Sequence, residues 1–293
     1  MSVLLQSAPS RPTRSRRTCH SVPGSSEKFL AKAPSLAADQ IFLDLEDSVA
    51  RGAKAEARGA IIQALNENDW ASGPQKTIVY RVNGTDTPFY YRDLIDVVEA
   101  AGDKIDAVML PKVQTPGDIE MTCKLLSQIE MSKGWELGRI GIEAQIEDAK
   151  GLIAGGAPAG YPGDHLNYLY SKIVVAARAA GIQAIDGPYA AFKDEEGLKV
   201  RTQLVRALGL DGKWTIHPAQ IDVVNAIFTP SQEQYDHAEG MLAAYEEAAD
   251  RGDQGAAIYD GEMIDEANRK MAERLAKAGR AAGLTPSPTT TEA

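Results

Sequence analysis

The sequence RIGIEAQIEDAKGLIAGGAPAGY, residues 139–161, joins an apolar strand to a loop rich in glycine and proline. Its two strand carboxylates, Glu143 and Glu147, are four positions apart, so both point to one face if the strand is regular. Glu147 is nearer the carboxyl end of the strand, and parallel β/α proteins bind their ligands beyond that end. Because a carboxylate there suits a hard divalent cation, Glu147 is a candidate metal ligand. The alternative is an acid that the dipole of a following helix favours.

Apolar strands and helical segments alternate outward from this stretch in both directions. Such alternation predicts parallel β/α construction with right-handed crossovers. The expected fold is α/β, a TIM-type (β/α)8 barrel, which requires eight strands. The sequence indicates seven strands, and they end near Gly24, Asp47, Gly84, Val113, Glu147, Tyr189 and His217.

Composition divides the chain into four parts. Residues 1–16 are basic and lack acids, which predicts a disordered tail, with an organelle transit peptide as the alternative. Residues 17–230 carry the β/α pattern of the barrel. Residues 231–284 form two helical segments around a loop and lie outside that pattern, so they are expected to be a C-terminal lid or subunit-contact arm. Residues 285–293, rich in Thr and Pro, are expected to be a disordered tail.

The composition also excludes several classes of protein. At 293 residues and 44% hydrophobic content, the chain can bury a barrel-sized core. A net charge of −10 argues against nucleic-acid or anionic-membrane partners, which require a basic face. Cys19 and Cys123 have no CxxC spacing, which favours a reducing cytoplasm. No apolar run reaches the roughly 18 residues of a transmembrane helix.

Polar residues follow most of the predicted strands, where a barrel binds its ligands. Arg81 comes directly after the apolar run TIVY, so its guanidinium is expected to be partly desolvated and able to hold a carboxylate or enolate oxygen. A structural ion pair with Asp44 or Asp47 is compatible with that role. Asp186 in DGP is interpreted as a turn residue. His217 in TIHPAQI is interpreted as a hydrogen-bonded structural histidine.

Eight ordered motifs between Arg17 and about Ala282 resemble one known family. The chain resembles the citrate lyase β-subunit-like, HpcH/HpaI aldolase family of CoA-ester lyases, and within it the lyases that act on malyl-CoA, β-methylmalyl-CoA or citramalyl-CoA. The motifs are SVPGSSEKF, IFLDLEDSV, VYRVNG, VMLPKV, AQIEDAKGL, QAIDGPY, GKWTIHPAQI and DGEMIDEA.

The resemblance implies a (β/α)8 barrel with a C-terminal lid and a Mg²⁺-dependent carbon–carbon lyase, with Mn²⁺ as an alternative metal. Such an enzyme cleaves a 3-hydroxyacyl-CoA to acetyl-CoA or propionyl-CoA and a 2-oxoacid such as glyoxylate. Cleavage of this type develops negative charge on the thioester oxygen, so a metal cation and a guanidinium are the expected catalysts. In this family Arg81 matches the arginine that stabilises the enolate, and Glu147 matches a Mg²⁺ ligand. Asp44 and Asp47 match acids that order Arg81 and metal-bound water.

Three further residues receive roles from the resemblance alone. Arg17 and Lys28 fall where family members contact the phosphates of CoA. Asp265, otherwise an ordinary helix acid, matches a lid aspartate that reaches a neighbouring subunit and exchanges a proton with the acetyl carbon. The implied assembly is therefore a homotrimer or homohexamer.

One segment departs from the family pattern. Family members follow the QIED-like motif with a helix and a strand that ends in a GPAD-like motif, whose aspartate is the second metal ligand. Here Leu152 leads almost directly to AGGAPAGYPGDH, so one α/β unit of about 30 residues is missing. Asp164 is the nearest acid that could replace the lost ligand, and open apolar edges should reduce stability. A malyl-CoA thioesterase or malate synthase-like enzyme, and a catalytically degenerate CoA-ester-binding paralogue, remain alternatives.

Overall fold

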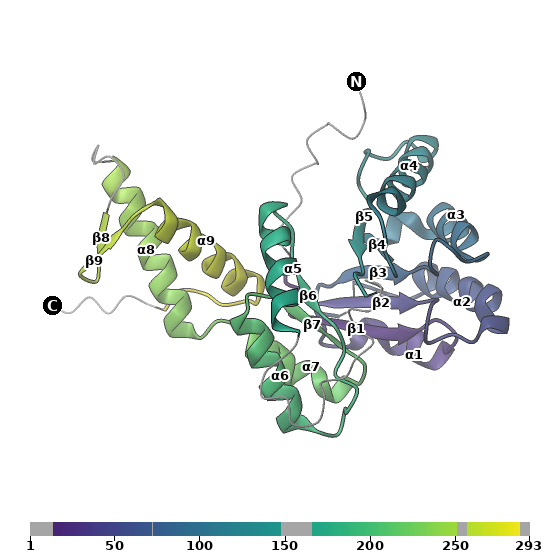
Figure 1. Cartoon of the computed structure of the whole chain (residues 1–293), viewed down its shortest axis with the longest axis horizontal. Coiled ribbons are helices and arrows are strands. Elements are labelled where there is room, and N and C mark those ends of the chain that lie inside the picture. The colour runs from purple at the N-terminus through teal and green to yellow at the C-terminus, as the bar shows by residue number, and fades with distance from the viewer. Residues whose placement is uncertain (1–13, 72, 148–165, 251–256, 288–293) are drawn as a thin grey trace. The chain divides into compact units, whose positions relative to one another are not determined.

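The structure is a computed structural model that describes residues 14–71, 73–147, 166–250 and 257–287 (Figure 1). Residues 1–13 of the predicted N-terminal tail, the loop that contains Asp164 and the last six residues lie outside this part. The fold divides into two compact units, Arg16–Asn225 and Ala226 to the C-terminal end. No helix of the described part combines the length and apolar character needed to cross a bilayer.

The first unit alternates strands with helices along the chain. Its strands are β1 (Thr18–Pro23), β2 (Gln40–Asp44), β3 (Thr77–Arg81), β4 (Ala107–Leu110), β5 (Gly141–Ala144), β6 (Ile185–Asp186) and β7 (Gly212–Thr215). Its α-helices are α1 (Glu27–Lys32), α2 (Lys54–Glu67), α3 (Tyr90–Ala101), α4 (Pro116–Lys133), α5 (Asn167–Ala179) and α6 (Glu195–Ala207), and α7 (Ile221–Phe228) spans the division. Short 3₁₀ helices are η2 (Ala33–Ser35), η3 (Arg51–Ala53), η4 (Gly102–Lys104) and η5 (Pro218–Gln220).

The seven strands form one parallel sheet in the order β5-β4-β3-β2-β1-β7-β6. A hydrogen bond across the sheet shows that it curls. Gln40 Nε2 of β2 donates to Glu143 Oε2 of β5 at 2.9 Å, although β3 and β4 lie between these strands. The prediction of a parallel α/β sheet is confirmed. The two edge strands, β5 and β6, are consecutive in the chain.

Both faces of the central strands are covered, which explains their nearly continuous apolar sequence. On the concave face, Phe42, Val79, Ala107 and Met109 form a small core with Trp214. On the outer face, alternate residues such as Leu43 and Tyr80 pack with helix residues in the main core. Figure 1 shows α2, α3 and α4 along this outer face.

Local sequence signals set the ends of the helices beside the site. Ser26 accepts a hydrogen bond from the Phe29 amide and caps α1. Thr115 and Asp118 form a reciprocal capping box at the start of α4, and Gly134 ends that helix with a φ of 68°. The chain that leaves the carboxyl edge after β4 therefore enters a helix with a defined first turn.

The second unit is a helical hairpin with a small antiparallel β-hairpin. It contains α8 (Gln232–Asp250), β8 (Ala257–Tyr259), β9 (Glu262–Ile264) and α9 (Glu266–Ala281). Tyr235 packs in the core between α8 and α9, where Gly279 leaves space for its ring. Arg280 donates two hydrogen bonds to Glu239 across the helices. The Ser287 amide, within the predicted C-terminal tail, donates a 2.9 Å hydrogen bond to Asp236.

Candidate active site

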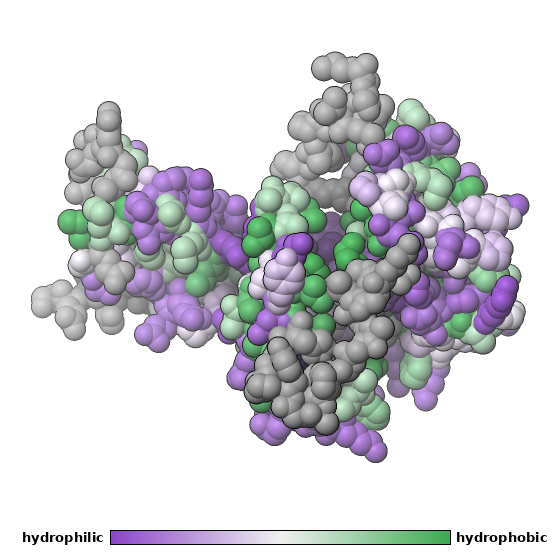
Figure 2. Space-filling model, viewed as in Figure 1, coloured by the Kyte–Doolittle hydropathy of each residue, from purple (hydrophilic) through white to green (hydrophobic). Residues whose placement is uncertain are grey.

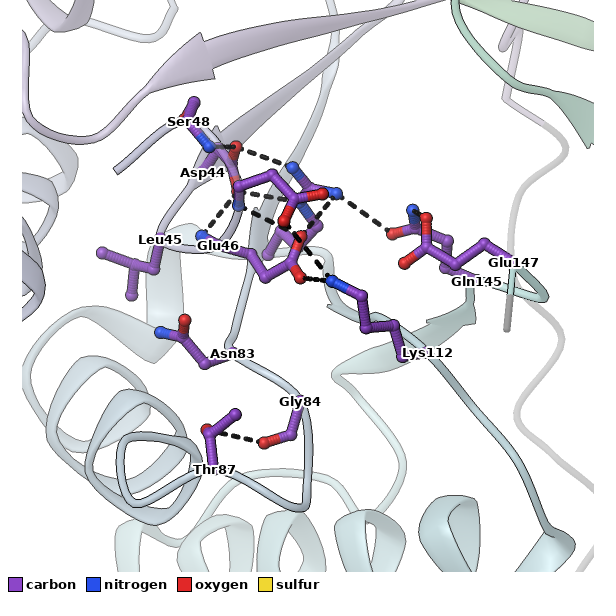
Figure 3. Close-up of polar contacts among 12 residues, drawn as sticks. Asp44, Leu45, Glu46, Ser48, Asn83, Gly84, Thr87, Lys112, Gln145 and Glu147 are labelled. Carbon is purple, nitrogen blue, oxygen red and sulfur yellow. Dashed lines mark hydrogen bonds and ion pairs between the residues drawn. The ribbon is translucent and has the colours of Figure 1, made fainter. Parts of the chain in front are cut away.

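Arg81 lies at the carboxyl edge of the sheet, where Figure 3 shows Asp44, Glu46, Lys112 and Glu147 gathered. It ends β3 beside Asp44, the last residue of β2, and the parallel register places these two residues opposite each other. Arg81 Nε and Nη2 donate hydrogen bonds of 2.7 Å to the two oxygens of Asp44. Burial would raise the pKa of Asp44, but the hydrogen bonds and charge of Arg81 lower it, so this carboxylate is ionised. The ion pair proposed from the sequence is present.

Further contacts fix the plane of the guanidinium. Nη1 lies 3.0 Å from Glu46 Oε2 and 3.4 Å from Gln145 Oε1. The rings of Phe42 and Trp214 lie 5.7 and 5.4 Å from the guanidinium carbon, which adds cation–π attraction. A guanidinium has five N–H bonds, and the contacts within the described part leave one Nη2 hydrogen for a ligand.

Glu46 was missed as a site residue from sequence, although it lies between the two predicted site acids Asp44 and Asp47. Its side chain is buried and joins two cations, Arg81 and Lys112. The signal was present, because Glu46 is two residues from Asp44 and alternation predicts the same face of the strand. Lys54, buried at the start of α2, donates to the carbonyl oxygens of Leu45 and Glu46 at 2.7 and 2.5 Å. Lys54 therefore holds the backbone from which these acids project.

Glu147 lies just beyond β5 and beside Gln145, which donates a hydrogen bond to Glu147 Oε2. Glu147 Oε1 is buried and has no hydrogen-bond partner in the described part of the chain. Burial and the charge of Glu46 raise the pKa of Glu147, while Lys112 and Arg81 oppose that rise. A buried carboxylate oxygen without a donor fits a cation ligand. Among the described residues, however, no three acids, histidines or cysteines converge as a metal-binding group.

Glu143, the other carboxylate of the opening stretch, lies deeper in the curl of the sheet. It accepts the hydrogen bond from Gln40 and lies 3.6 Å from Arg16, the last residue of the predicted tail. Burial raises the pKa of Glu143, and Arg16 and Gln40 counter it. Glu143 thus links strands within the sheet, whereas Glu147 stands at its carboxyl edge.

The other residues predicted for the site have different surroundings. Asp47 is exposed, and within the described residues its carboxylate pairs with Lys112, at 3.4 Å. Arg17 precedes β1 at the opposite, amino edge, where its Nε and Nη2 donate 2.8 Å hydrogen bonds to Asp39. Lys28 is exposed on α1. Asp265 belongs to the second unit, where it caps α9 by accepting from the Asn268 amide.

Asp186 of the DGP sequence was predicted to be a turn residue, but it belongs to β6 and to a second charged cluster. Asp186 is a buried strand residue, and its carboxylate lies 2.5 Å from Lys213 Nζ on the neighbouring β7. The Tyr170 hydroxyl donates to Asp186 at 2.8 Å, and burial followed by the charge of Asp186 raises the pKa of Tyr170 to about 12. His217 accepts a hydrogen bond from the Ala219 amide at 3.2 Å, in keeping with its structural interpretation.

The curled parallel sheet defines an α/β protein, and the charged groups at its carboxyl edge form a candidate ligand site. The model of the HpcH/HpaI aldolase/citrate lyase family matches residues 17–154 and 156–218. The chain belongs to this family.

Two curated relatives and one solved structure show similarity across most of the chain. An L-malyl-CoA/β-methylmalyl-CoA lyase from Cereibacter sphaeroides is 37% identical over 94% of this chain and 98% of its own length. A (3S)-malyl-CoA thioesterase from the same species is 36% identical, over 88% and 92% respectively. The CitE protein of Mycobacterium tuberculosis, solved with magnesium, acetoacetate and coenzyme A, has a TM-score of 0.61 and 25% identity, over 91% of this chain and 98% of that one.

Proposed function

We propose that the protein is a Mg²⁺-dependent CoA-ester lyase that cleaves a 3-hydroxyacyl-CoA of the malyl-CoA type into acetyl-CoA or propionyl-CoA and a 2-oxoacid such as glyoxylate. The observation that carries this proposal is the oriented Arg81, held by Asp44 and Glu46, beside the unpartnered oxygen of Glu147. The 37% identity to a malyl-CoA/β-methylmalyl-CoA lyase supports the same substrate class.

Arg81 is the proposed stabiliser of the enolate. When the carbon–carbon bond breaks, its electron pair moves into the thioester and negative charge gathers on the carbonyl oxygen. The remaining Nη2 hydrogen of Arg81 can donate to that oxygen, and the bidentate bond to Asp44 keeps the guanidinium from reorienting. The site therefore requires little rearrangement as charge develops.

Glu147 is the proposed protein ligand of Mg²⁺, with Mn²⁺ as the alternative metal. The metal would supply Lewis-acid stabilisation of the oxygen atoms of the 2-oxoacid. Asp44, Glu46, Asp47 and Glu147 carry four negative charges against the three positive charges of Arg81, Lys54 and Lys112, which favours a cation beside Glu147.

The remaining assignments are proposals of the same kind. Lys28 is better placed than Arg17 for a CoA phosphate, because Lys28 is exposed whereas both oxygens of Asp39 bind Arg17. Asp47 is proposed to order metal-bound water. Asp265 is proposed to return the proton to the acetyl carbon from a neighbouring subunit of a homotrimer or homohexamer, with residues 231–284 acting as the lid. The free thiols of Cys19 and Cys123 support a cytoplasmic location.

We further infer that the sheet is a (β/α)8 barrel that lacks one α/β unit between β5 and α5. The open edges of the sheet belong to β5 and β6, the strands that flank this position in the chain. Figure 2 shows hydrophobic residues on the surface over α5. Two large side chains of this helix, Tyr168 and Val175, are each 68% exposed. The lyase match spans 318 positions, but 94% of 293 residues is about 275, so roughly 43 positions lack a counterpart here.

Incubation of the purified chain with malyl-CoA, with and without Mg²⁺, tests the proposal. Formation of glyoxylate that depends on Mg²⁺ is expected. It should be lost in Glu147→Gln and retained in Glu136→Gln, which removes an exposed acid from the loop before β5. If the folded wild-type chain binds CoA but forms no glyoxylate, the lyase proposal is wrong and a degenerate CoA-ester-binding protein is favoured.

A thioesterase is the second candidate, because the malyl-CoA thioesterase is nearly as similar as the lyase. Attack of water on the thioester would use the same Arg81 and the same metal to stabilise an oxyanion. The products distinguish the two reactions. A lyase releases glyoxylate and acetyl-CoA, whereas a thioesterase releases malate and free CoA.

A further inference from the structure

Lys112 has an uncommon backbone conformation at the edge of the site. Its φ is 52°, in the left-handed region, and among the other described non-glycine residues only Asp260 has a positive φ. A positive φ costs energy in a residue that has a Cβ atom, so contacts with the surrounding structure must hold Lys112 in this conformation. The turn follows β4 and directs the side chain to Glu46 (Figure 3).

Lys112 is also the most accessible of the three cations grouped around Glu46, which are Arg81, Lys54 and Lys112. Its side chain is 39% exposed, against 6% for Arg81. Lys54 is buried beneath the loop that follows β2. An anion that arrives from solvent would therefore meet the Lys112 ammonium before the other two cations.

The two partners of Lys112 differ in how easily they can be replaced. Glu46 is buried and is shared with Arg81, so its contact is fixed from both sides. Asp47 is 67% exposed and lies 3.4 Å from Nζ. Exposed ion pairs of this type contribute little to stability. An incoming carboxylate can therefore replace Asp47 while Lys112 keeps its contact with Glu46.

A polar cavity of about 190 Å³ adjoins Lys112. Lys112 is the one cationic residue among those that line the cavity. Asp118, an acid in the same wall, already accepts hydrogen bonds from the Thr85 hydroxyl and from the amides of Gln114 and Thr115. On the other side, Lys112 acts electrostatically on Glu147. Lys112 thus lines the cavity and also acts on the proposed metal ligand. The cavity is lined by Thr85, Asp86, Lys112, Gln114, Thr115 and Asp118.

We propose that Lys112 binds the free carboxylate of the acyl group and so selects CoA esters that carry one. This inference rests on the proposed function, since malyl-CoA has a free carboxylate at the end away from the thioester. Lys112 is then a specificity-determining residue, and its pairing with Asp47 is the arrangement of the protein without ligand.

A matched pair of uncleavable esters provides the test. Succinyl-CoA and butyryl-CoA differ in a terminal carboxylate against a methyl group, and neither has the hydroxyl that cleavage requires. In buffer with Mg²⁺, calorimetry should show about tenfold tighter binding of succinyl-CoA by the wild type. Lys112→Met should abolish the preference without weakening butyryl-CoA, and Lys112→Arg should keep most of it. Lys133→Met, which removes an exposed lysine at the end of α4, should behave as the wild type.

Several outcomes would overturn the inference. A preference that persists in Lys112→Met assigns the carboxylate to another group. An equal loss for both esters means that Lys112 acts only through Glu46 and Arg81. If the wild type binds neither ester, the proposed function fails together with this inference. Absence of glyoxylate from malyl-CoA, with the ester preference intact, overturns the lyase proposal alone.

Discussion

At the level of single residues, the charged groups of the site form ion pairs and hydrogen bonds with one another, and one carboxylate oxygen in the described part does not. Asp44 and Glu46 bind the guanidinium of Arg81, and Lys112 binds the second oxygen of Glu46. Glu147 Oε1 alone among these groups is buried without a partner in the described part. An acid in such a position is unfavourable for folding and useful for binding a cation.

Glu147→Gln should therefore stabilise the metal-free protein at neutral pH. Burial and Glu46 raise the pKa of Glu147, so its contribution to stability is fully present below the unfolded pKa of about 4.3 and is lost as pH rises through the folded pKa. The advantage of the variant should grow from about pH 4 toward neutrality, and partial burial limits it to under about 1 kcal/mol. Thermal unfolding in chelator between pH 4 and 8 measures it. A variant less stable than wild type at pH 7 would contradict this account.

Lys54→Met should loosen the loop that carries Asp44 and Glu46. It removes the ammonium from the carbonyl oxygens of Leu45 and Glu46, and an unsatisfied buried acceptor costs about 1–3 kcal/mol. Urea unfolding should show this loss, and Lys133→Met on α4 should show almost none. Equal midpoints for wild type and Lys54→Met would mean that Lys54 is not needed to hold the loop.

At the level of elements, the unusual feature is a parallel sheet whose edge strands, β5 and β6, each pair with only one strand among the described residues. The Gly141 and Gln145 amides donate to Asp106 and Leu110 on the β4 side. Because amides alternate along a strand, those of Ile142 and Ala144 point toward the open edge. Parallel sheets are normally buried on both faces and closed or covered at their edges.

Hydrogen exchange should therefore divide β5 residue by residue. The Ile142 and Ala144 amides are expected to exchange much faster than the Gly141 and Gln145 amides, because only the latter pair has a strand partner. Phe42, in the central strand β2, serves as the protected reference. If Ile142 and Ala144 are as protected as Gly141, this edge is paired in solution and the inferred gap in the barrel is wrong.

At the level of the whole molecule, the chain forms two compact units with separate cores. The first depends on buried strands and their helices, whereas the second depends on the contact between α8 and α9. Gly279 is central to the second core, because a Cβ there would lie 2.3 Å from Tyr235 Cδ2.

Gly279→Ala should consequently destabilise the second unit by about 1–3 kcal/mol through overpacking. Faster exchange in α8 and α9, with unchanged protection in β2 and β3, is the expected pattern. Gly59→Ala provides a matched control on α2, where an added Cβ meets no atom within 4 Å and should stabilise the helix by roughly 0.5–1 kcal/mol. Loss of protection in β2 along with α8 would show that the two units unfold together.

Much of this architecture follows from local sequence. Apolar runs that end in polar residues located the strands, and the run TIVY followed by Arg81 was enough to predict a partly desolvated guanidinium that could pair with Asp44 or Asp47. Strand alternation could also have predicted that Glu46 points to the same face as Asp44 and therefore toward Arg81. Arg17 was different, because its partner Asp39 is twenty-two residues away and lies at the amino edge of the next strand.

The sequence alone predicted the pattern of strands and helices, the parallel α/β class and the charged residues at the ends of β2, β3 and β5. These features follow from periodicity and strand direction, which are local properties. Only the tertiary structure decided that Glu46 bridges Arg81 and Lys112, that Asp186 pairs with Lys213, and that the open edges are β5 and β6. The physical reason is that such contacts join segments far apart in the chain. Their geometry depends on how the sheet curls and on which side chains lose water when it does.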